Sequence, residues 1–240
     1  MKIGGLQKIS LIDFPGRIAA VIFTQGCNLR CPYCQNPDLI KITETSPVSL
    51  NAVWEYLLSR RKQLDGVAIT GGEPLMQKDI IETIKKIKNL GYEVKIDTNG
   101  TFPETLKKLI ADGNIDYIAM DIKAPPRNYS MIVGRKISFE PIKKSIELIM
   151  DGNVPYEFRS TLVSGFHDEK MIDEMARLII GAEKYVLQNL SGYRTLDPEY
   201  TKLSPFNLKM MKHFQSIASQ YVKTCTIRGG DAVGSLNKIH

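Results

Sequence analysis

Short apolar runs alternate with amphipathic helical segments along almost the whole 240-residue chain, and this alternation constrains the fold more than any other feature. The first pair shows the pattern: IAAVIFT (18–24) is rich in β-branched residues, and SLNAVWEYLLSRRKQL (49–64) has apolar residues at helical spacing behind Ser49. The later strands are expected at 66–70, 92–98, 115–123, 154–163, 184–188 and 221–227, and the later helices at 78–90, 103–113, 139–152, 168–180 and 204–220.

The alternation of strands and helices predicts the fold class. Parallel strands need crossover helices, so this succession predicts a parallel sheet with helices outside. A complete eight-unit barrel takes about 250 residues. We therefore expect an α/β fold, a partial (open) parallel β/α barrel of about six βα units, built as one domain over residues 1–240.

The composition is that of an ordinary globular protein, with 43% hydrophobic and 24% charged residues. No apolar run reaches the roughly 18–20 residues that span a bilayer, and the first residues, MKIGGLQKIS, lack the apolar core of a leader peptide. We therefore expect a cytoplasmic protein with no membrane partner, in which clustered cysteines indicate metal binding or catalysis rather than disulfides. The net charge of +6 is modest and the lysines fall on helical faces, so we expect solvated surface and no nucleic-acid partner.

Polar, non-periodic residues gather where the predicted strands end. GCNLRCPYCQNP (26–37) follows the first strand and GGEP (71–74) follows the second. The later strands carry Asp97, Thr98, Asn99, Gly100, Asp121, Lys123 and Gln188 at or near their ends, and Arg159 lies within the strand expected at 154–163. The carboxyl ends of parallel strands share one face, where ligands bind. The shared position of these residues therefore predicts a functional site at that face.

Three of the four cysteines, Cys27, Cys31 and Cys34, lie close together in the loop after the first strand. A disulfide inside this C-x3-C-x2-C run would constrain little of the chain. Structural zinc takes four protein ligands, and the candidates for a fourth, Cys225 and His167, lack paired spacing. A [4Fe–4S] cluster held by three thiolates leaves one iron without a protein ligand. The spacing therefore suits a cluster with an open coordination position best.

These motifs resemble those of the radical S-adenosylmethionine (SAM) superfamily. The cysteine spacing, with Tyr33 just before the last cysteine, is similar to its cluster motif, here in a loop over residues 25–37, and GGEP is similar to its SAM-amine element. The longer stretch GGLQKISLIDFPGRIAAVIFTQGCNLRCPYCQNP resembles the amino-terminal signature of the activating proteins of anaerobic ribonucleoside-triphosphate reductase. These are glycyl-radical-enzyme activases, similar to the pyruvate formate-lyase activating enzyme. Similarity continues through ITGGEP, IDTNG, MDIK and FRSTLVSGFHDE, and it implies a barrel of the radical SAM type.

The resemblance also implies a role for each matching residue. The [4Fe–4S] cluster would be ligated by Cys27, Cys31 and Cys34. The residues that would bind SAM are Gly71, Gly72 and Glu73 at its amine, Lys123 and Arg159 at its carboxylate, Asn99 and Gln188 at its ribose or adenine, and Tyr33 against the adenine. A monovalent-cation site would comprise Asp97, Thr98 and Asp121, with a plain bridge between a carboxylate and Lys123 as an equal alternative.

The reaction that the resemblance implies needs two protein partners. An external one-electron donor such as flavodoxin or ferredoxin would reduce the cluster, since the chain has no nucleotide or flavin motif. Reductive cleavage of SAM would then give methionine and a 5′-deoxyadenosyl radical, which removes hydrogen from a glycine Cα of the second partner. We expect that partner to be the large subunit of anaerobic ribonucleotide reductase, or another glycyl radical enzyme of the pyruvate formate-lyase type.

Two other functions compete with this one. The first is a radical SAM enzyme acting on a small molecule or an RNA base, such as a 7-carboxy-7-deazaguanine synthase, and the second is a non-enzymatic metal-binding or electron-carrying domain. Two positions differ from many activases, which carry histidine where this chain has Gln35 and often another near Gln188. The fourth cysteine, Cys225, lies in an apolar segment and is expected to be a buried small hydrophobe.

Overall fold

The computed structural model describes residues 1–190 and 194–229, and the chain divides into two compact units. Unit 1 consists of Met1–Arg30, Asn36–Met120 and Phe139–Tyr156. Unit 2 consists of Cys31–Gln35, Asp121–Ser138 and the chain from Glu157 onward. In the described part of the chain, no helix is both long and apolar enough to cross a membrane.

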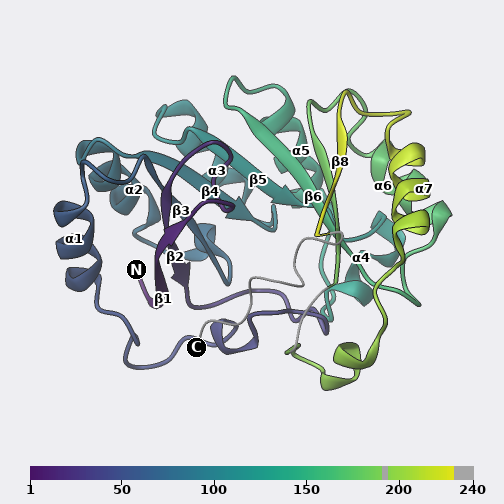
Figure 1. Cartoon of the computed structure of the whole chain (residues 1–240), viewed down its shortest axis with the longest axis horizontal. Helices are drawn as coiled ribbons and strands as arrows, with labels where there is room; N and C mark the ends of the chain where they lie inside the picture. The colour runs from purple at the N-terminus through teal and green to yellow at the C-terminus, as the bar shows by residue number, and fades with distance from the viewer. Residues whose placement is uncertain (191–193, 230–240) are drawn as a thin grey trace. The chain divides into compact units, whose positions relative to one another are not determined.

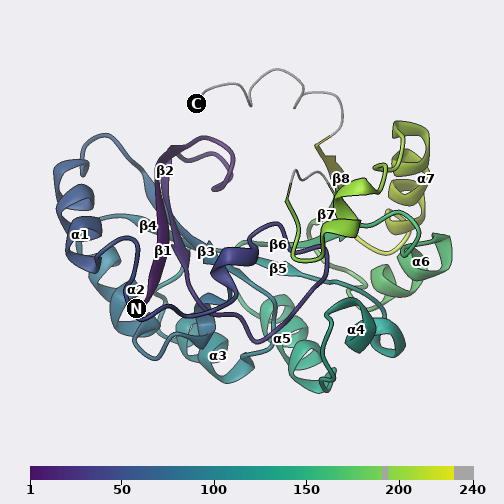
Figure 2. The ribbon, with the colours of Figure 1, turned by 90° about the horizontal axis from the view of Figure 1, so that it is seen from below.

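Unit 1 consists of strands joined by helices. Its strands are β1 (Ile3–Ser10), β2 (Ala19–Thr24), β3 (Gly66–Gly71), β4 (Glu93–Thr98) and β5 (Tyr117–Asp121, whose last residue belongs to unit 2). Its helices are α1 (Leu50–Ser59), α2 (Ile80–Asn89), α3 (Pro103–Ala111) and α5 (Glu140–Met150), with short 3-10 helices η1 (Pro37–Leu39) and η2 (Pro74–Met76). The strands β2, β3, β4 and β5 pair in parallel in this order, and β1 is antiparallel to β2. Figures 1 and 2 show α1, α2 and α3 along one face of these strands.

Unit 2 has the same organisation on a smaller scale. Its strands are β6 (Tyr156–Leu162, whose first residue belongs to unit 1), β7 (Tyr185–Asn189) and β8 (Cys225–Arg228). Its helices are α4 (Pro126–Ile132), α6 (Glu169–Arg177) and α7 (Leu208–Ala218), with the 3-10 helix η3 (Pro198–Lys202). The pairs β6–β7 and β7–β8 are parallel, as crossover helices require. Figure 1 shows α6 and α7 on the side of the molecule where β8 lies.

The expected class, an α/β fold with an open, mostly parallel sheet, is confirmed. Within the described residues, each strand from β2 to β7 is followed by a helix before the next strand, which gives the six βα units expected. Local signals also match, since the Ser49 side chain accepts a hydrogen bond from the Ala52 N–H (3.1 Å) as the N-cap of α1. Gly91 follows α2 with a φ of +91°, a conformation that favours glycine at a helix end.

The strand β1 and the helix α4 are not among the predicted elements. The β1 segment contains Gly4 and Gly5, which weaken strand propensity, and it forms through its pairing with β2, where Ile3 is fully buried. The α4 segment begins at Pro126 after another proline, a pattern that suggests a turn, yet proline fits the first turn of a helix. Burial of Tyr129 on this helix stabilises it in place.

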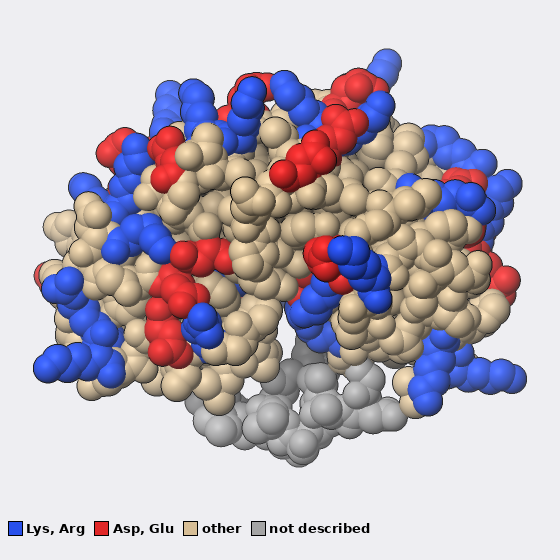
Figure 3. Space-filling view, turned by 90° about the horizontal axis from the view of Figure 1, so that it is seen from above, with Lys and Arg blue, Asp and Glu red and all other residues tan. Residues whose placement is uncertain are grey.

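The basic residues lie among acidic ones on the helical surface. Lys85 pairs with Asp112 (3.2 Å) and Lys144 pairs with Glu104. Figure 3 shows blue and red side chains interspersed over the face it displays. This arrangement agrees with the expectation of a solvated, mixed-charge surface.

Candidate functional site

The loop after β2 is held to its neighbours by main-chain hydrogen bonds within unit 1. The N–H of Gly26 donates to the Leu39 carbonyl (2.7 Å), the N–H of Cys27 to the Ile40 carbonyl (3.1 Å), and the N–H of Glu73 to the Gly26 carbonyl (2.8 Å). Gly26 has a φ of +94°, which glycine adopts at little cost. The main chain thereby places the first cysteine of the motif at the carboxyl end of β2, beside the GGEP turn.

Gly72 lies against this loop with no room for a side chain, because a Cβ would be 2.1 Å from the Gly26 carbonyl oxygen. Gly72→Ala is therefore expected to push the two loops apart and to lower the free energy of unfolding by about 1–3 kcal/mol. Chemical denaturation measures this loss. Gly5→Ala is the matched control, since a Cβ there would be 3.6 Å from the nearest Phe23 atom, an ordinary contact. Equal stability of the two variants would contradict the steric explanation.

The fully buried carboxylate of Glu73 connects the GGEP turn to the end of β4. Its Oε1 accepts hydrogen bonds from the Leu75 N–H (3.1 Å) and the Thr98 hydroxyl (2.8 Å), and its Oε2 accepts one from the Asn99 N–H (2.7 Å). Three donors favour the charged form of a buried carboxylate. Sequence reasoning assigned Glu73 to the SAM amine and missed this connection.

Amide groups surround the sulfur of Cys27. The Leu29 N–H donates to its Sγ (3.4 Å), and the Asn99 side-chain amide lies 3.9 Å from the same atom. That amide also donates to the side-chain carbonyl of Asn28 (3.0 Å). N–H groups directed at a sulfur favour its thiolate form. Cys27 and Asn99, both predicted site residues, therefore lie together.

The other two cysteines of the motif lie in the short segment Cys31–Gln35 of unit 2. The N–H of Cys34 donates to the Cys31 carbonyl (2.9 Å), and the Cys34 carbonyl accepts from the Leu196 N–H (3.0 Å). The N–H of Asp197 donates to the carbonyl of Pro32 (2.9 Å). Sequence reasoning missed Leu196 and Asp197, because they act through main-chain atoms that leave no motif.

Tyr33 and Tyr129 are buried tyrosines of unit 2. The Tyr33 ring lies 6.5 Å from the Tyr200 ring, measured between centroids. Burial raises the pKa of Tyr33 well above its ordinary value and also raises the pKa of Tyr129, so both phenols are neutral at physiological pH. Tyr33 is the predicted adenine neighbour, and Tyr129 is a residue that sequence reasoning missed.

Asp121, Lys123 and Arg159 form a charged cluster in unit 2. The Lys123 ammonium lies 3.2 Å from Asp121 Oδ2, and Arg159 places its Nε and Nη2 at 3.1 and 3.0 Å from Asp121 Oδ1. Burial alone would raise the pKa of Asp121, but Lys123 and Arg159 hold that pKa below its ordinary value. Burial would likewise lower the pKa of Lys123, yet the Asp121 carboxylate helps to raise it well above the ordinary lysine value. The cluster thus places two cationic side chains around one carboxylate.

Asp97 has an ammonium partner on its own strand. The Lys95 side chain is 2% exposed and pairs with the Asp97 carboxylate two residues along β4. Thr98 gives its hydroxyl hydrogen to Glu73. Of the three residues expected to form a cation site, Asp97 is thus paired with Lys95, and Asp121 with Lys123 and Arg159. Lys95 was missed because a lysine in an alternating strand is typical of a solvent-facing position.

Two further sequence candidates are Gln188 and Cys225. Gln188 lies near the end of β7, opposite Thr161 on β6 and Arg228 on β8. No disulfide links the four cysteines, all of which lie in the described part of the chain. Cys225 is buried, as expected of a small hydrophobe, and burial raises its pKa to about 12. Across the described ranges, no group of three or more His, Cys, Asp and Glu side chains is arranged to hold a metal ion.

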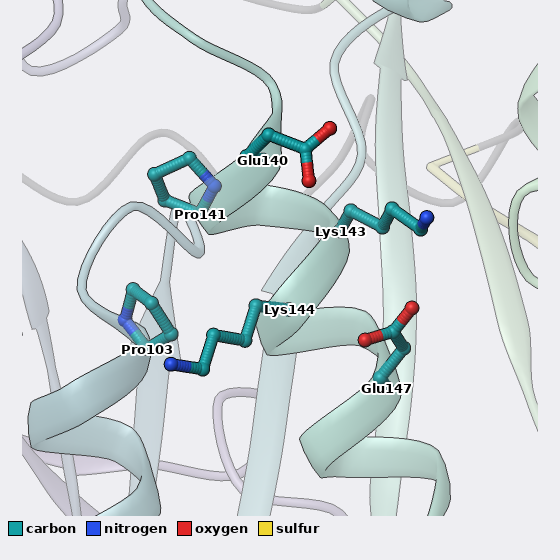
Figure 4. Close-up of a pocket in the computed structure, with 6 residues that line it drawn as sticks. All are labelled: Pro103, Glu140, Pro141, Lys143, Lys144 and Glu147. Carbon is teal, nitrogen blue, oxygen red and sulfur yellow. The ribbon is translucent and has the colours of Figure 1, made fainter.

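A surface cavity of about 480 Å³ lies apart from these residues, between α3 and α5 of unit 1. Figure 4 shows the residues that line it: Pro103, Glu140, Pro141, Lys143, Lys144 and Glu147. The two lysines and two glutamates balance in charge, and none of the predicted site residues lines the cavity.

Comparison with protein families decides the class of the chain. The model of the radical SAM superfamily matches residues 21–179, which contain the three clustered cysteines, GGEP and the Asp121, Lys123 and Arg159 cluster. The chain belongs to the radical SAM superfamily. Enzymes of this superfamily use a [4Fe–4S] cluster and SAM, and these are the cofactors of the chain.

Two relatives place this radical SAM enzyme among the activases. A protein of Methanocaldococcus jannaschii whose name assigns it to the glycyl-radical enzyme activating enzymes is 35% identical over 234 residues, covering 94% of this chain and 95% of the relative. The pyruvate formate-lyase-activating enzyme of Clostridium pasteurianum is 31% identical over 216 residues, covering 85% and 87%. The radical SAM chain is therefore an activase of the kind that acts on a glycyl radical enzyme.

Solved structures share the radical SAM fold. SuiB of Streptococcus suis bound to S-adenosylmethionine has a TM-score of 0.66 at 17% identity, and the match covers 87% of this chain but only 50% of SuiB. A domain of a pyruvate-formate lyase-activating enzyme from Bacteroides vulgatus has a TM-score of 0.55 at 22% identity, covering 68% of this chain and 99% of that domain. At these identities the likeness concerns the fold alone.

The residues present fit the two cofactors of a radical SAM enzyme. Thiolates are the ligands that iron–sulfur clusters take, and amide groups directed at the Cys27 sulfur favour that form. The two cationic side chains of the cluster, Lys123 and Arg159, suit a carboxylate such as that of SAM.

Proposed function

We propose that this activase generates a glycyl radical on its partner with a [4Fe–4S] cluster ligated by Cys27, Cys31 and Cys34. The bound cofactors supply a one-electron cleavage of SAM and the carbon radical that removes a glycine hydrogen. The observation that carries the proposal is the charged cluster of Asp121, Lys123 and Arg159, whose two cationic side chains complement the SAM carboxylate.

The other SAM contacts in this proposal follow the strand ends. The carbonyl groups of the GGEP turn, at Gly71 and Gly72, receive the SAM amine, with Glu73 holding that turn in place. Asn99 and Gln188 bind the ribose or adenine, and Tyr33 packs against the adenine. Neutral amides and a neutral, buried phenol suit these uncharged groups.

A cation site at Asp97, Thr98 and Asp121 stays a weaker part of the proposal. Lys95 and Lys123 already give the two carboxylates positive partners. We therefore consider the Lys95 ammonium a stronger candidate than a bound monovalent cation for the positive charge beside Asp97.

Two kinds of glycyl radical enzyme are supported as the partner. We also propose an external flavodoxin or ferredoxin as the electron donor and the cytoplasm as the location. The amino-terminal signature favours anaerobic ribonucleotide reductase. The 31% identity with a pyruvate formate-lyase-activating enzyme favours a partner of the pyruvate formate-lyase type. This match runs over 216 residues and is therefore longer than the amino-terminal signature. We therefore place the pyruvate formate-lyase type first and the reductase second.

Electron paramagnetic resonance tests both parts of the proposal. Anaerobically reconstituted, reduced protein is expected to show a [4Fe–4S] signal that changes when SAM is added. Adding a glycyl radical enzyme of either type should then produce a glycine-centred doublet. The control is a partner whose radical-forming glycine is replaced by alanine. A cluster signal indifferent to SAM would refute the activase mechanism, whereas a doublet with one partner only would identify that partner.

A further inference from the structure

His167 is buried in the turn between β6 and α6, and the proposed reaction does not use it. The His167 residue is only 4% exposed. The ring Nδ1 of His167 accepts a hydrogen bond from the Val163 N–H (3.0 Å). The main-chain N–H of His167 donates to the Val163 carbonyl (3.0 Å). Gly165, with a φ of +78°, allows the chain to turn between them. The imidazole therefore closes this turn on one side.

The other ring nitrogen of His167 faces a different segment. Its Nε2 lies 3.0 Å from the carbonyl oxygen of Lys123. Burial lowers the pKa of His167, so the ring is neutral at physiological pH. Because Nδ1 accepts a hydrogen bond, the single ring proton is on Nε2, which donates to the Lys123 carbonyl.

The Lys123 carbonyl lies where the chain leaves the sheet. The preceding residue, Ile122, is held on both sides: its N–H donates to the Arg159 carbonyl (2.7 Å), and its carbonyl accepts from the Ser160 hydroxyl. Beyond Lys123 the two prolines at 125–126 have no N–H groups with which to continue such bonding. The imidazole of His167 thus fixes the peptide from which the Lys123 side chain extends toward Asp121.

We propose that His167 is a positioning residue for Lys123, holding the main chain so that the ammonium stays in the charged cluster that meets the carboxylate of SAM. The inference rests on the proposed function, in which Lys123 makes that contact. It differs from a purely structural role, in which His167 would only stabilise the turn through Val163.

Two amide variants separate the two hydrogen bonds of the ring. His167→Gln places an amide N–H₂ near the position of Nε2 and keeps the donor to Lys123. His167→Asn places an amide oxygen near Nδ1, which keeps the acceptor for Val163 and loses the donor to Lys123. Isothermal titration of the reconstituted holoenzyme with SAM is expected to give a dissociation constant about five- to tenfold higher for the Asn variant. The Gln variant should stay within about twofold of the parent protein, because it keeps the hydrogen bond to Lys123.

A second measurement needs no cofactor. Hydrogen–deuterium exchange of the apo-protein over residues 121–124 should quicken in the Asn variant and stay near the parent rate in the Gln variant. Lys123→Met serves as the reference for the proposed function, with an expected loss of SAM affinity of about ten- to a hundredfold from the missing charge-assisted bond.

The outcomes distinguish the two levels of inference. Weak SAM binding by Lys123→Met, with the Asn variant weaker than the Gln variant, supports the positioning role. If Lys123→Met is weak but the two histidine variants bind alike, or the Gln variant is the weaker, the positioning role is refuted while the proposed function stands. If Lys123→Met binds SAM as tightly as the parent, the carboxylate assignment fails and the positioning role fails with it.

Discussion

Replacing Cys31 with alanine is expected to remove the iron–sulfur cluster and all radical-forming activity together. Three thiolates are the proposed protein ligands, and a cluster that loses one of three has too few thiolates to be retained. Iron and sulfide analysis after anaerobic reconstitution measures the first effect, and the paramagnetic signal measures the second. The fold itself should persist, since Cys31 lies in a loop outside the helices and strands.

Cys225→Ala is the matched control for the Cys31 experiment. Cys225 lies on β8 and is 9% exposed. Burial raises the pKa of its thiol to about 12, so this cysteine is a poor source of thiolate. This variant should keep the full iron content and lose only some packing energy. A Cys31→Ala protein that retains cluster and SAM cleavage would refute the ligand assignment, and loss of iron from the Cys225 variant would point to a different ligand set.

Replacing Glu73 with glutamine is expected to destabilise the protein by about 3 kcal/mol, because a buried carboxylate with three donors is exchanged for a group that is itself a donor. Both carboxylate oxygens accept, Oε1 from Leu75 and Thr98 and Oε2 from Asn99. The single amide oxygen of glutamine can accept at only one of the two oxygen positions. Its N–H₂ group then lies at the other position and faces a hydrogen-bond donor there. Urea denaturation of the apo-protein measures the loss without any cofactor present.

Thr98→Val provides the graded control for Glu73→Gln. It removes one of the three donors and leaves the carboxylate with its two main-chain partners, so a loss of about 1 kcal/mol is expected. If Glu73 acted chiefly on the SAM amine, Glu73→Gln would weaken SAM binding and leave the stability of the apo-protein unchanged. That result would overturn the connecting role described for Glu73.

The positions of the predicted site residues could be found from the sequence because they interrupt a regular pattern. Asp121 and Lys123 are polar residues at or just after a strand end, Arg159 is a charged residue within the strand β6, and the structure brings them into one cluster. The strand β1 could not be found in this way, since its two glycines and polar residues gain strand structure only from pairing with β2.

The supporting residues were hidden for a different reason. His167 was considered only as a fourth metal ligand, but its contacts are main-chain groups of Val163 and Lys123. Contacts with the main chain place no requirement on the identity of the partner side chain, so no motif records them. The pairing of Lys95 with Asp97 is equally silent, because neighbours two residues apart on a strand are expected to share a face without necessarily bonding.

The pairing of Lys95 and Asp97 has a consequence for how this sequence can change during evolution. An almost completely buried ammonium without its carboxylate, or the reverse, leaves an uncompensated charge that is strongly destabilising. Substitutions at positions 95 and 97 are therefore expected to occur together among relatives. In a relative that keeps the carboxylate but carries a neutral residue at position 95, we expect another positive group or a monovalent cation to take the place of the ammonium. The residue at position 95 would then separate enzymes that supply this charge from their own chain at that position from those that take it from elsewhere.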